Sequence, residues 1–193
     1  MSANKFIDGL NNNYSKTTLT KIDLSNLDLS SCTSLDRAFC MNDTLETIDF
    51  GNNDISQVTR MSGTFMSCPE LKTVNISKCN FNTSKVIYFD RAFSYVNINN
   101  IQEIINKITL DSCINTSEMF YGSDYEILDL SKWDFSNVTR MSGMFEHCTK
   151  LKAIPTLKNT KNVTNINYMF QDCISLPESA FTNGLPFDTS SVT

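Results

Sequence analysis

Residues 137–145 read Asn-Val-Thr-Arg-Met-Ser-Gly-Met-Phe, and residues 57–65 read Gln-Val-Thr-Arg-Met-Ser-Gly-Thr-Phe. The two segments share Val-Thr-Arg-Met-Ser-Gly-x-Phe. Six segments of the chain carry a phenylalanine at this last position: Phe39, Phe65, Phe93, Phe120, Phe145 and Phe170. The intervals between these marker phenylalanines are 26, 28, 27, 25 and 25 residues. A nearly constant period of this length is typical of solenoid proteins, in which each repeat forms one turn.

Each repeat has two halves. The first half has the pattern apolar-x-x-apolar-x-apolar, as at Leu45, Ile48 and Phe50, and continues into an Asn or Cys position. This pattern matches the leucine-rich-repeat template and predicts a strand with one buried face. The second half spaces its apolar residues by three or four, which predicts a short helix or 3₁₀ turn. We therefore expect an α/β repeat solenoid: a leucine-rich-repeat-like right-handed superhelix with a parallel β-sheet on one face and short helical turns on the other.

Two regions depart from the repeat pattern. Ile101, Ile104, Ile105 and Ile108 have helical spacing after the candidate N-caps Asn99 and Asn100, so we expect a helix there and then a strand around residues 109–110. Residues 1–17, with Phe6, Ile7 and Leu10, predict a capping segment with a small helix. Residues 18–193 then form five to six repeats, the last of them incomplete.

The last residues repeat an internal segment without completing it. Residues 187–193 match residues 81–87, and the marker phenylalanine of that repeat does not follow. An incomplete repeat leaves an apolar face without a cover. Either the natural chain continues beyond this point, or another chain covers this face. In the second case Phe187 and Val192 are candidate residues of a terminal interface with a protein partner or a larger assembly, of which an oligomer is one form.

Charge and composition bear on the class of partner. The chain has 193 residues and a formal net charge of −5, with 16 basic residues. Nucleic-acid-binding proteins carry basic faces, so we expect no nucleic-acid partner. No apolar run reaches the roughly 18 residues that a membrane-spanning helix needs, and the first residues lack a signal-peptide pattern. These features predict cytoplasmic synthesis without membrane insertion, with incorporation into a virion or surface assembly left open.

The segment from Leu130 to Cys148 resembles the BspA-like repeats of bacterial surface proteins, which also occur in mycoplasma lipoproteins. The resemblance extends over about residues 18–193. It implies a leucine-rich-repeat-type solenoid on surface proteins that adhere to host or matrix components without catalysis. It brings no functional residues to this chain, because the residues of the motif are structural.

Polar residues on the predicted sheet form the main candidate site. The residues between buried strand positions should line one sheet face in a row, and they are Asp23, Asp49, Asn75, Thr109, Asp129 and Pro155. Stacked carboxylates in such a row attract a cation or a basic partner or have raised pKa values, unless they are simply solvated. The broken row of carboxylates does not form a calcium cage, so we expect no metal. The candidate partner-facing row consists of Lys21, Asp23, Thr47, Asp49, Thr73, Asn75, Ile127 and Asp129.

Cysteine, histidine and arginine give weaker signals. Three of the seven cysteines follow a marker phenylalanine by three residues, which indicates small buried side chains rather than disulfides or a metal site. The single histidine, His147, adjoins Cys148, but adjacent residues on a helical turn do not face each other, so a nucleophilic pair is disfavoured. Arg60 and Arg140 share one repeat position, and Arg37 and Arg91 share another. These two columns form either a partner-binding rim or side chains that extend over the aromatic core.

These observations predict a protein without enzymatic activity or cofactor. We expect a protein-interaction or structural module of a surface assembly, which binds through its extended sheet face and the terminal interface. The alternatives are a structural component of a phage virion (capsid or tail decoration), a host-adhesion fragment of a cell-surface protein, and an intracellular scaffold. A hydrolase that uses the carboxylate row or a cysteine is the enzymatic alternative, and it requires a deep pocket with converging polar groups.

Overall fold

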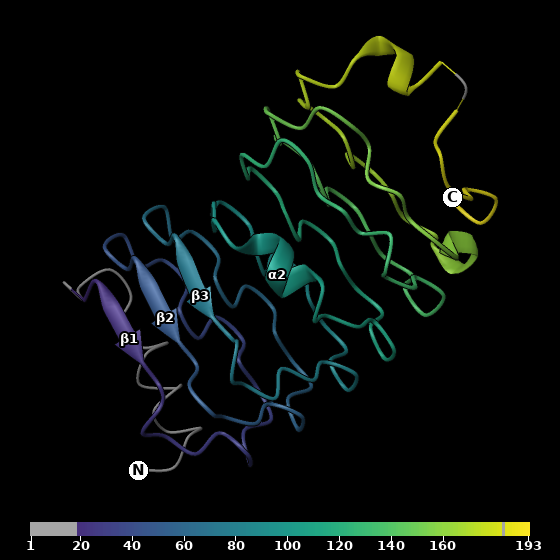
Figure 1. Ribbon diagram of the computed structural model, residues 1–193. Coiled ribbons are helices and arrows are strands. Elements are labelled where there is room, and N and C mark those ends of the chain that lie inside the picture. The colour runs from purple at the N-terminus through teal and green to yellow at the C-terminus, as the bar shows by residue number, and fades with distance from the viewer. Residues whose placement is uncertain (1–18, 183) are drawn as a thin grey trace.

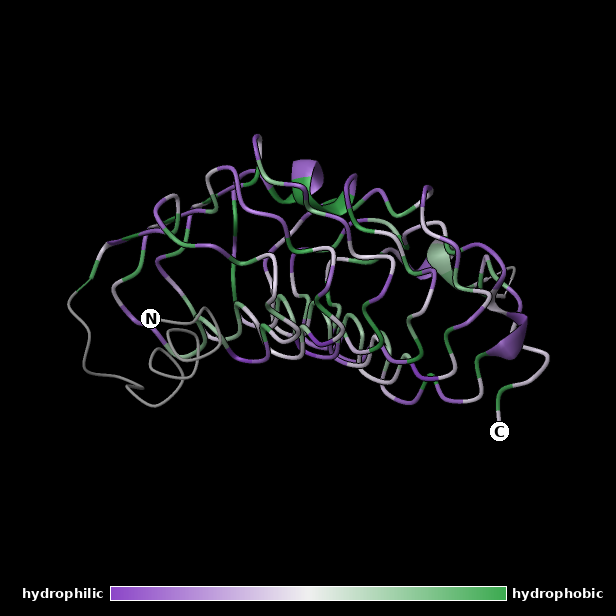
Figure 2. Ribbon diagram, turned by 90° about the horizontal axis from the view of Figure 1, so that it is seen from below, coloured by the Kyte–Doolittle hydropathy of each residue, from purple (hydrophilic) through white to green (hydrophobic). Residues whose placement is uncertain are grey.

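The computed structural model describes residues 19–182 and 184–193. Figure 1 shows successive turns of the chain lying side by side from the N-terminal to the C-terminal end, and Figure 2 shows that together they form a shallow arch. The elements in chain order are β1 (Lys21–Asp23), β2 (Thr47–Asp49), β3 (Thr73–Asn75), α2 (Ile101–Ile105), η1 (Thr160–Asn162) and η2 (Glu178–Ala180). Within the described ranges, no helix combines the length and the apolar character that crossing a membrane requires. The predicted capping segment, residues 1–17, lies outside the described residues.

The three strands form one parallel sheet in the order β1-β2-β3. Each strand pairs with the residues one repeat further on, so Ile22 lies beside Ile48, and Ile48 beside Val74. These three central side chains are buried, while their neighbours along each strand are exposed or half-exposed. A β-branched residue between two polar residues suits a strand with one buried face. The strand prediction is confirmed for these three repeats.

The second half of each repeat is not helical, which corrects the expectation of short helical turns. In the repeat that contains Phe65, alternate N–H groups donate to carbonyl oxygens of the following repeat at 2.8 to 3.0 Å: Met61 to Tyr88, Gly63 to Asp90, Phe65 to Ala92 and Ser67 to Ser94. Two of the three intervening N–H groups close turns within the repeat, Thr64 to Met61 and Met66 to Gly63. A helix would use all of these donors internally, so the bonds between repeats exclude it.

These consecutive turns require a left-handed backbone at two positions of each repeat. The first precedes the marker phenylalanine by two residues and has φ between 53° and 61°: Arg37, Gly63, Arg91, Glu118, Gly143 and Tyr168. The second follows the phenylalanine by two residues, as at His147 with φ 58°. Glycine is favoured at such positions, yet only three of the twelve are glycine. The hydrogen bonds between repeats therefore hold nine other residues in this conformation, at an energetic cost.

The marker phenylalanines form the centre of the core, as their spacing predicted. Neighbouring rings are stacked with centroids 5.5 to 5.8 Å apart in all five steps from Phe39 to Phe170. Four of the five steps have interplanar angles of 12° or less, and the fifth has 20°. We call this row of six rings the phenylalanine ladder. It extends through six repeats and links them into one continuous core.

Helix α2 occupies the place where the next repeat would add a strand beside β3. The Asn100 side chain accepts a hydrogen bond from Val74 N–H at 3.2 Å and donates to Val74 O at 2.9 Å. On the other side of the helix, Gln102 pairs with the backbone of Asp129 in the same way, at 3.1 and 3.0 Å. Two side-chain amides thus replace a strand. The predicted helix is confirmed, whereas the strand expected at residues 109–110 is absent from the structure as described.

Candidate functional site

The predicted partner-facing row is continuous over β1 to β3 only. Lys21, Thr47 and Thr73 lie beside one another, as do Asp23, Asp49 and Asn75. Ile127 and Asp129 belong to a later repeat, are separated from β3 by α2 and lie in no strand. The prediction that Ile127 and Asp129 share one sheet face with β1 to β3 is therefore wrong, because α2 takes the place of the strand that would connect them.

The carboxylates of this row form turns. Asp23, Asp49 and Asp129 each accept a hydrogen bond from the backbone N–H two residues further on, at 2.8 to 3.0 Å. Hydrogen bonds from Ser25 and Ser131 lower the pKa of Asp23 and Asp129, because they stabilise the charged form. Among the described residues, no three metal-ligating side chains gather into a group that could hold an ion.

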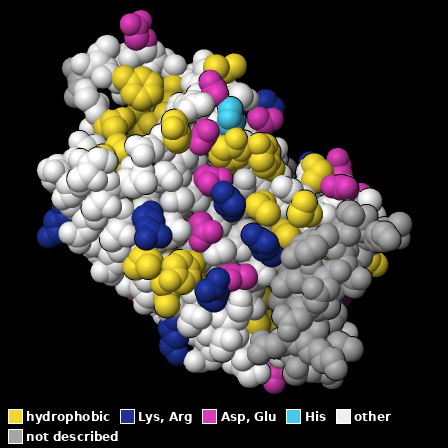
Figure 3. Space-filling model, turned by 180° about the vertical axis from the view of Figure 1, so that it is seen from behind, with side chains coloured by type: hydrophobic (Ala, Val, Ile, Leu, Met, Phe, Trp, Pro, Cys, Tyr) yellow, Lys and Arg dark blue, Asp and Glu magenta, His cyan; other side chains and the backbone are white. Residues whose placement is uncertain are grey.

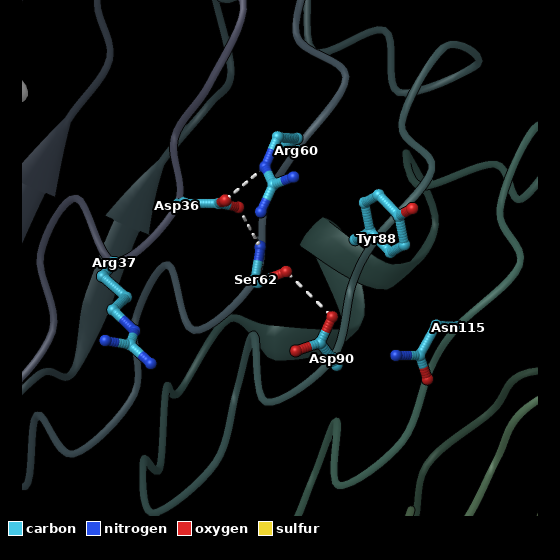
Figure 4. Close-up of a pocket in the computed structure, with 7 residues that line it drawn as sticks. All are labelled: Asp36, Arg37, Arg60, Ser62, Tyr88, Asp90 and Asn115. Carbon is cyan, nitrogen blue, oxygen red and sulfur yellow. Dashed lines mark hydrogen bonds and ion pairs between the residues drawn. The ribbon is translucent and has the colours of Figure 1, made fainter.

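A groove with charged walls lies where the second halves of neighbouring repeats meet, and Figure 4 shows it in close-up. Its volume is about 560 Å³. The residues that line it come from four successive repeats: Asp36, Arg37, Arg60, Ser62, Tyr88, Asp90 and Asn115. We call this site the charged groove.

Hydrogen bonds between repeats fix the side chains of the charged groove. Asp36 forms an ion pair with Arg60 and also accepts a hydrogen bond from Ser62 N–H at 2.8 Å. The Ser62 hydroxyl donates to Asp90 at 2.8 Å. The Arg60 guanidinium lies 5.3 Å from the centre of the Tyr88 ring, in cation–π contact, and its pKa is raised by Asp36. Contacts between repeats thus hold the side chains of Asp36, Arg60, Ser62 and Asp90 in place before any partner binds.

The charged groove belongs to a longer column of aligned residues. Parallel bridges connect the equivalent position of six repeats: Ser34, Arg60, Tyr88, Asn115, Arg140 and Asn165. On the face opposite to that of Figure 1, acidic and basic side chains lie close together (Figure 3). The predicted alignment of Arg60 with Arg140 is confirmed. Arg60 and Arg91 form ion pairs with acidic residues of adjacent repeats, Asp36 and Glu118.

The cysteines have structural positions, as predicted. All seven are buried free thiols. Cys68, Cys148 and Cys173 each donate to the carbonyl of the marker phenylalanine one repeat earlier, at 2.8 to 3.0 Å, and Ser123 makes the same bond at 2.7 Å. Burial raises the pKa of Cys68 and Cys148 to about 12. Such thiols are poor nucleophiles at neutral pH.

The side chains of His147 and Cys148 point in different directions. His147 lies 3.2 Å from Asp172 and packs edge-on against Tyr121, whereas Cys148 points to Phe120 O in the core. No histidine–cysteine pair forms, which agrees with the sequence argument.

Sequence reasoning placed Arg60 and Arg37 in two separate columns of aligned arginines, but it missed Tyr88 and Asp90. Tyr88 lies at the repeat position of Arg60, and Asp90 at that of Asp36. A comparison of all six repeats at these two positions would have shown a column of polar and charged residues. The repeat is recognised by its apolar core positions, and these give no information on the polar positions between them.

Comparison with known proteins identifies a family. The sequence model of the family described as "Mycoplasma protein of unknown function, DUF285" matches residues 8–126 and, in a second match, residues 114–193. No curated protein and no solved structure matches the chain. The two matches together cover residues 8–193, nearly the whole chain. The chain therefore belongs to the DUF285 family of mycoplasma proteins of unknown function.

Proposed function

We propose that this chain is a leucine-rich-repeat-like right-handed solenoid of BspA-like repeats that acts as a protein-interaction module without enzymatic activity. The phenylalanine ladder and the hydrogen bonds between equivalent repeat positions support the solenoid. A core built in this way needs no cofactor to hold it together. Each repeat instead presents its surface residues at a fixed spacing.

The charged groove is the observation that carries the proposal. Arg60 and Tyr88 belong to the residue types that most often dominate protein–protein binding energy, and both are held by contacts between repeats. Neighbouring repeats follow one another at about the spacing of hydrogen-bonded strands, roughly 4.8 Å. A partner that lies across the repeats would therefore meet a new donor or acceptor at short, regular intervals. An extended polypeptide segment carries backbone donors and acceptors along its whole length, so it suits such a surface.

The experiment first identifies a partner and then tests the surface. A photo-crosslinking amino acid at Asn115 captures the bound protein, which is then produced pure and titrated against three forms of the chain. We expect the groove variant Arg60→Ala/Tyr88→Ala to weaken binding about tenfold or more, because two anchoring side chains are removed. Circular dichroism and thermal unfolding confirm that each variant is folded.

The matched control is on the sheet face. Lys21→Ala/Thr73→Ala removes two exposed side chains of the predicted row and should leave the dissociation constant unchanged. If this control weakens binding while the groove variant does not, the sheet face is the binding surface. If neither variant changes the affinity, the proposed site is wrong.

A further inference from the structure

A small pocket lies outside the charged groove and shares no residue with it. Its volume is about 290 Å³, and its walls come from the repeats of Phe65, Phe93 and Phe120. These three repeats have a described repeat on either side. The pocket is therefore separate from the predicted terminal residues Phe187 and Val192, which are half-buried beyond the last complete repeat.

Ser94 brings a buried hydroxyl group to this pocket. The residue is 3% exposed, and its hydroxyl makes no hydrogen bond within residues 19–182 and 184–193. The other six buried polar residues each form at least one side-chain hydrogen bond: Asn53, Thr64, Thr83, Thr116, Ser123 and Thr160. Burial of an unpaired polar group is unfavourable, so a ligand that pairs with this hydroxyl gains a compensating hydrogen bond.

Tyr95 supplies an aromatic surface beside this hydroxyl. Gly122 gives its ring room to lie across the next repeat, since a Cβ atom at Gly122 would lie 2.5 Å from the ring. Tyr121 contacts the same ring edge-on with centroids 5.1 Å apart, and a side-chain hydrogen bond with Tyr95 raises the pKa of Tyr121 to about 12. Tyr121 also packs against His147, and Figure 3 shows hydrophobic side chains beside this histidine. The Tyr95 side chain is thus held by its neighbours while the residue stays 51% exposed.

A planar ion pair adds polar groups to the same pocket. Arg91 Nε and Nη2 each donate to one carboxylate oxygen of Glu118 at 2.8 Å. This arrangement uses two of the five N–H donors of the guanidinium group. Both side chains remain partly exposed, so further donors of Arg91 and lone pairs of Glu118 can pair with a ligand. Because the two charges balance, the pocket favours a neutral ligand.

We propose that this pocket binds a neutral sugar residue. A pyranose ring has a face of C–H groups that packs on Tyr95, and its hydroxyl groups both donate and accept hydrogen bonds. Such hydroxyls can pair with Ser94, Arg91 and Glu118 at once. An apolar side chain would leave the Ser94 hydroxyl unpaired, and a charged ligand would lose hydration without meeting an opposite net charge. The volume lies at the lower end of the roughly 300 to 1,000 Å³ of small-molecule pockets, which suits a single ring.

The test is an NMR titration of the isotope-labelled full chain with four probes, the methyl glycosides of glucose, galactose, mannose and N-acetylglucosamine. We expect at least one glycoside to shift the amide signals of Ser94 and Tyr95 in a saturable way. Tyr95→Ala should weaken its binding about tenfold, because the surface on which the ring packs is lost. The proposal is overturned if none of the four glycosides shifts these signals, or if the shifts are confined to other parts of the chain.

Ser94→Ala separates a binding role from a structural one. It removes a hydroxyl that has no partner in the described structure, so the thermal midpoint should stay the same or rise. The affinity for the glycoside should fall about threefold or more, because one hydrogen bond to the ligand is lost. A lower midpoint with unchanged affinity would overturn the proposal, since the hydroxyl would then stabilise the fold.

The matched control is the groove variant Arg60→Ala/Tyr88→Ala, which changes no residue of this pocket. It should keep the glycoside affinity, so failure of the sugar site and failure of the charged groove are distinguishable. Trilysine is the peptide probe, and shifts of Ser94 and Tyr95 by trilysine alone would assign the pocket to a protein partner and overturn the proposal. Competition by a glycoprotein, before and after its glycans are removed, and by a polysaccharide of the bound sugar distinguishes the two natural sources of such a residue.

Discussion

At the scale of single residues, short polar side chains take the part that glycine and proline have in many loops. Asp28, Asp54, Asn82, Asp134 and Asp188 hold the same place in five repeats, and each accepts a hydrogen bond from the serine N–H two residues further on, at 2.7 to 3.0 Å. Such side chains stabilise turns by pairing with nearby backbone groups. This explains why a chain with 6 glycines and 4 prolines can turn several times in every repeat.

Asn53 is the clearest buried example and gives the first residue-scale prediction. It is 6% exposed, donates to Leu24 O and Phe50 O at 2.8 Å, and accepts from Leu29 N–H at 3.0 Å. Asn53→Ala removes three buried hydrogen bonds and leaves Leu29 N–H without an acceptor, while Leu24 O and Phe50 O keep one backbone donor each, so we expect a loss of about 2 kcal/mol in the free energy of unfolding. Urea unfolding measures it. The neighbouring exposed residue supplies the control, Asn52→Ala, which should change stability by less than about 0.5 kcal/mol.

At the scale of elements, α2 divides the sheet-forming side of the molecule. β1 to β3 lie before it, and the residues equivalent to a strand in the later repeats form none in the part of the chain that the structure describes. Ile101, Ile104 and Ile105 are buried and direct one face of the helix into the core. The helix therefore preserves the core while it interrupts the sheet.

The two amide side chains beside α2 give an element-scale prediction. Asn100→Ala should speed hydrogen exchange at Val74 N–H, and Gln102→Ala should speed it at Asp129 N–H, because each variant removes the acceptor of that N–H. Each variant should cost about 1 kcal/mol. Asn99→Ala, whose side chain makes no hydrogen bond in the described structure, should change neither rate. If the Asn99 variant accelerates exchange equally, the amides are not the strand substitutes that their geometry indicates.

At the scale of the whole molecule, the repeats share their stabilising features, so small effects add. The phenylalanine ladder, the turn-forming carboxylates and the buried thiols each recur along the chain. A change of pH that affects one of the turn-forming carboxylates or one of the buried thiols therefore affects the equivalent groups in the other repeats. The pH dependence of stability should show this most directly.

Stability should fall at both low and high pH. Hydrogen bonds lower the folded-state pKa of Asp28, Asp54, Asp134 and Asp188, so their contribution is present above the unfolded pKa of about 3.9 and is lost as the pH falls further. Burial raises the pKa of Cys68 and Cys113 to about 12, so their contribution is lost as the pH rises above the unfolded value of about 8.5. We expect the urea midpoint to be greatest between about pH 5 and 8.

Two variants separate the acidic and the alkaline effects. Asp54→Asn/Asp134→Asn keeps the turns, as Asn82 does naturally, and should make the loss at low pH shallower. Cys68→Ser keeps a donor to Phe39 O, as Ser123 does for Phe93 O, and should make the loss at high pH shallower. Unchanged profiles in both variants would contradict the assignment of these groups.

The core was predictable from the sequence, and much of the charged groove was not. Phe39 to Phe170 could be aligned because equivalent core positions must all be apolar and therefore share a visible pattern. Tyr88 and Asp90 lie at surface positions, where the residue type varies among the repeats. Their proximity to Arg60 and Ser62 follows from stacking, because contacts across 26 to 28 residues depend on how the repeats are placed.

The structure of the second half of the repeat could not be predicted from the spacing of its apolar residues alone. Spacings of three and four residues, as between Met61 and Phe65, fit a helix as well as a series of turns. The choice depends on where the N–H groups donate. Half of them have carbonyl partners in the next repeat, and a helix would forfeit those bonds.

The amino-acid sequence by itself determined the period, the apolar ladder, the buried cysteines and the helix near residue 101. These features depend on which side chains are buried away from water, and burial can be predicted from the type and the spacing of the residues. The tertiary structure alone decided that the second half forms turns, that α2 ends the sheet and that a charged groove lies between repeats. These depend on hydrogen bonds between residues far apart in the chain, which exist only once the repeats are stacked.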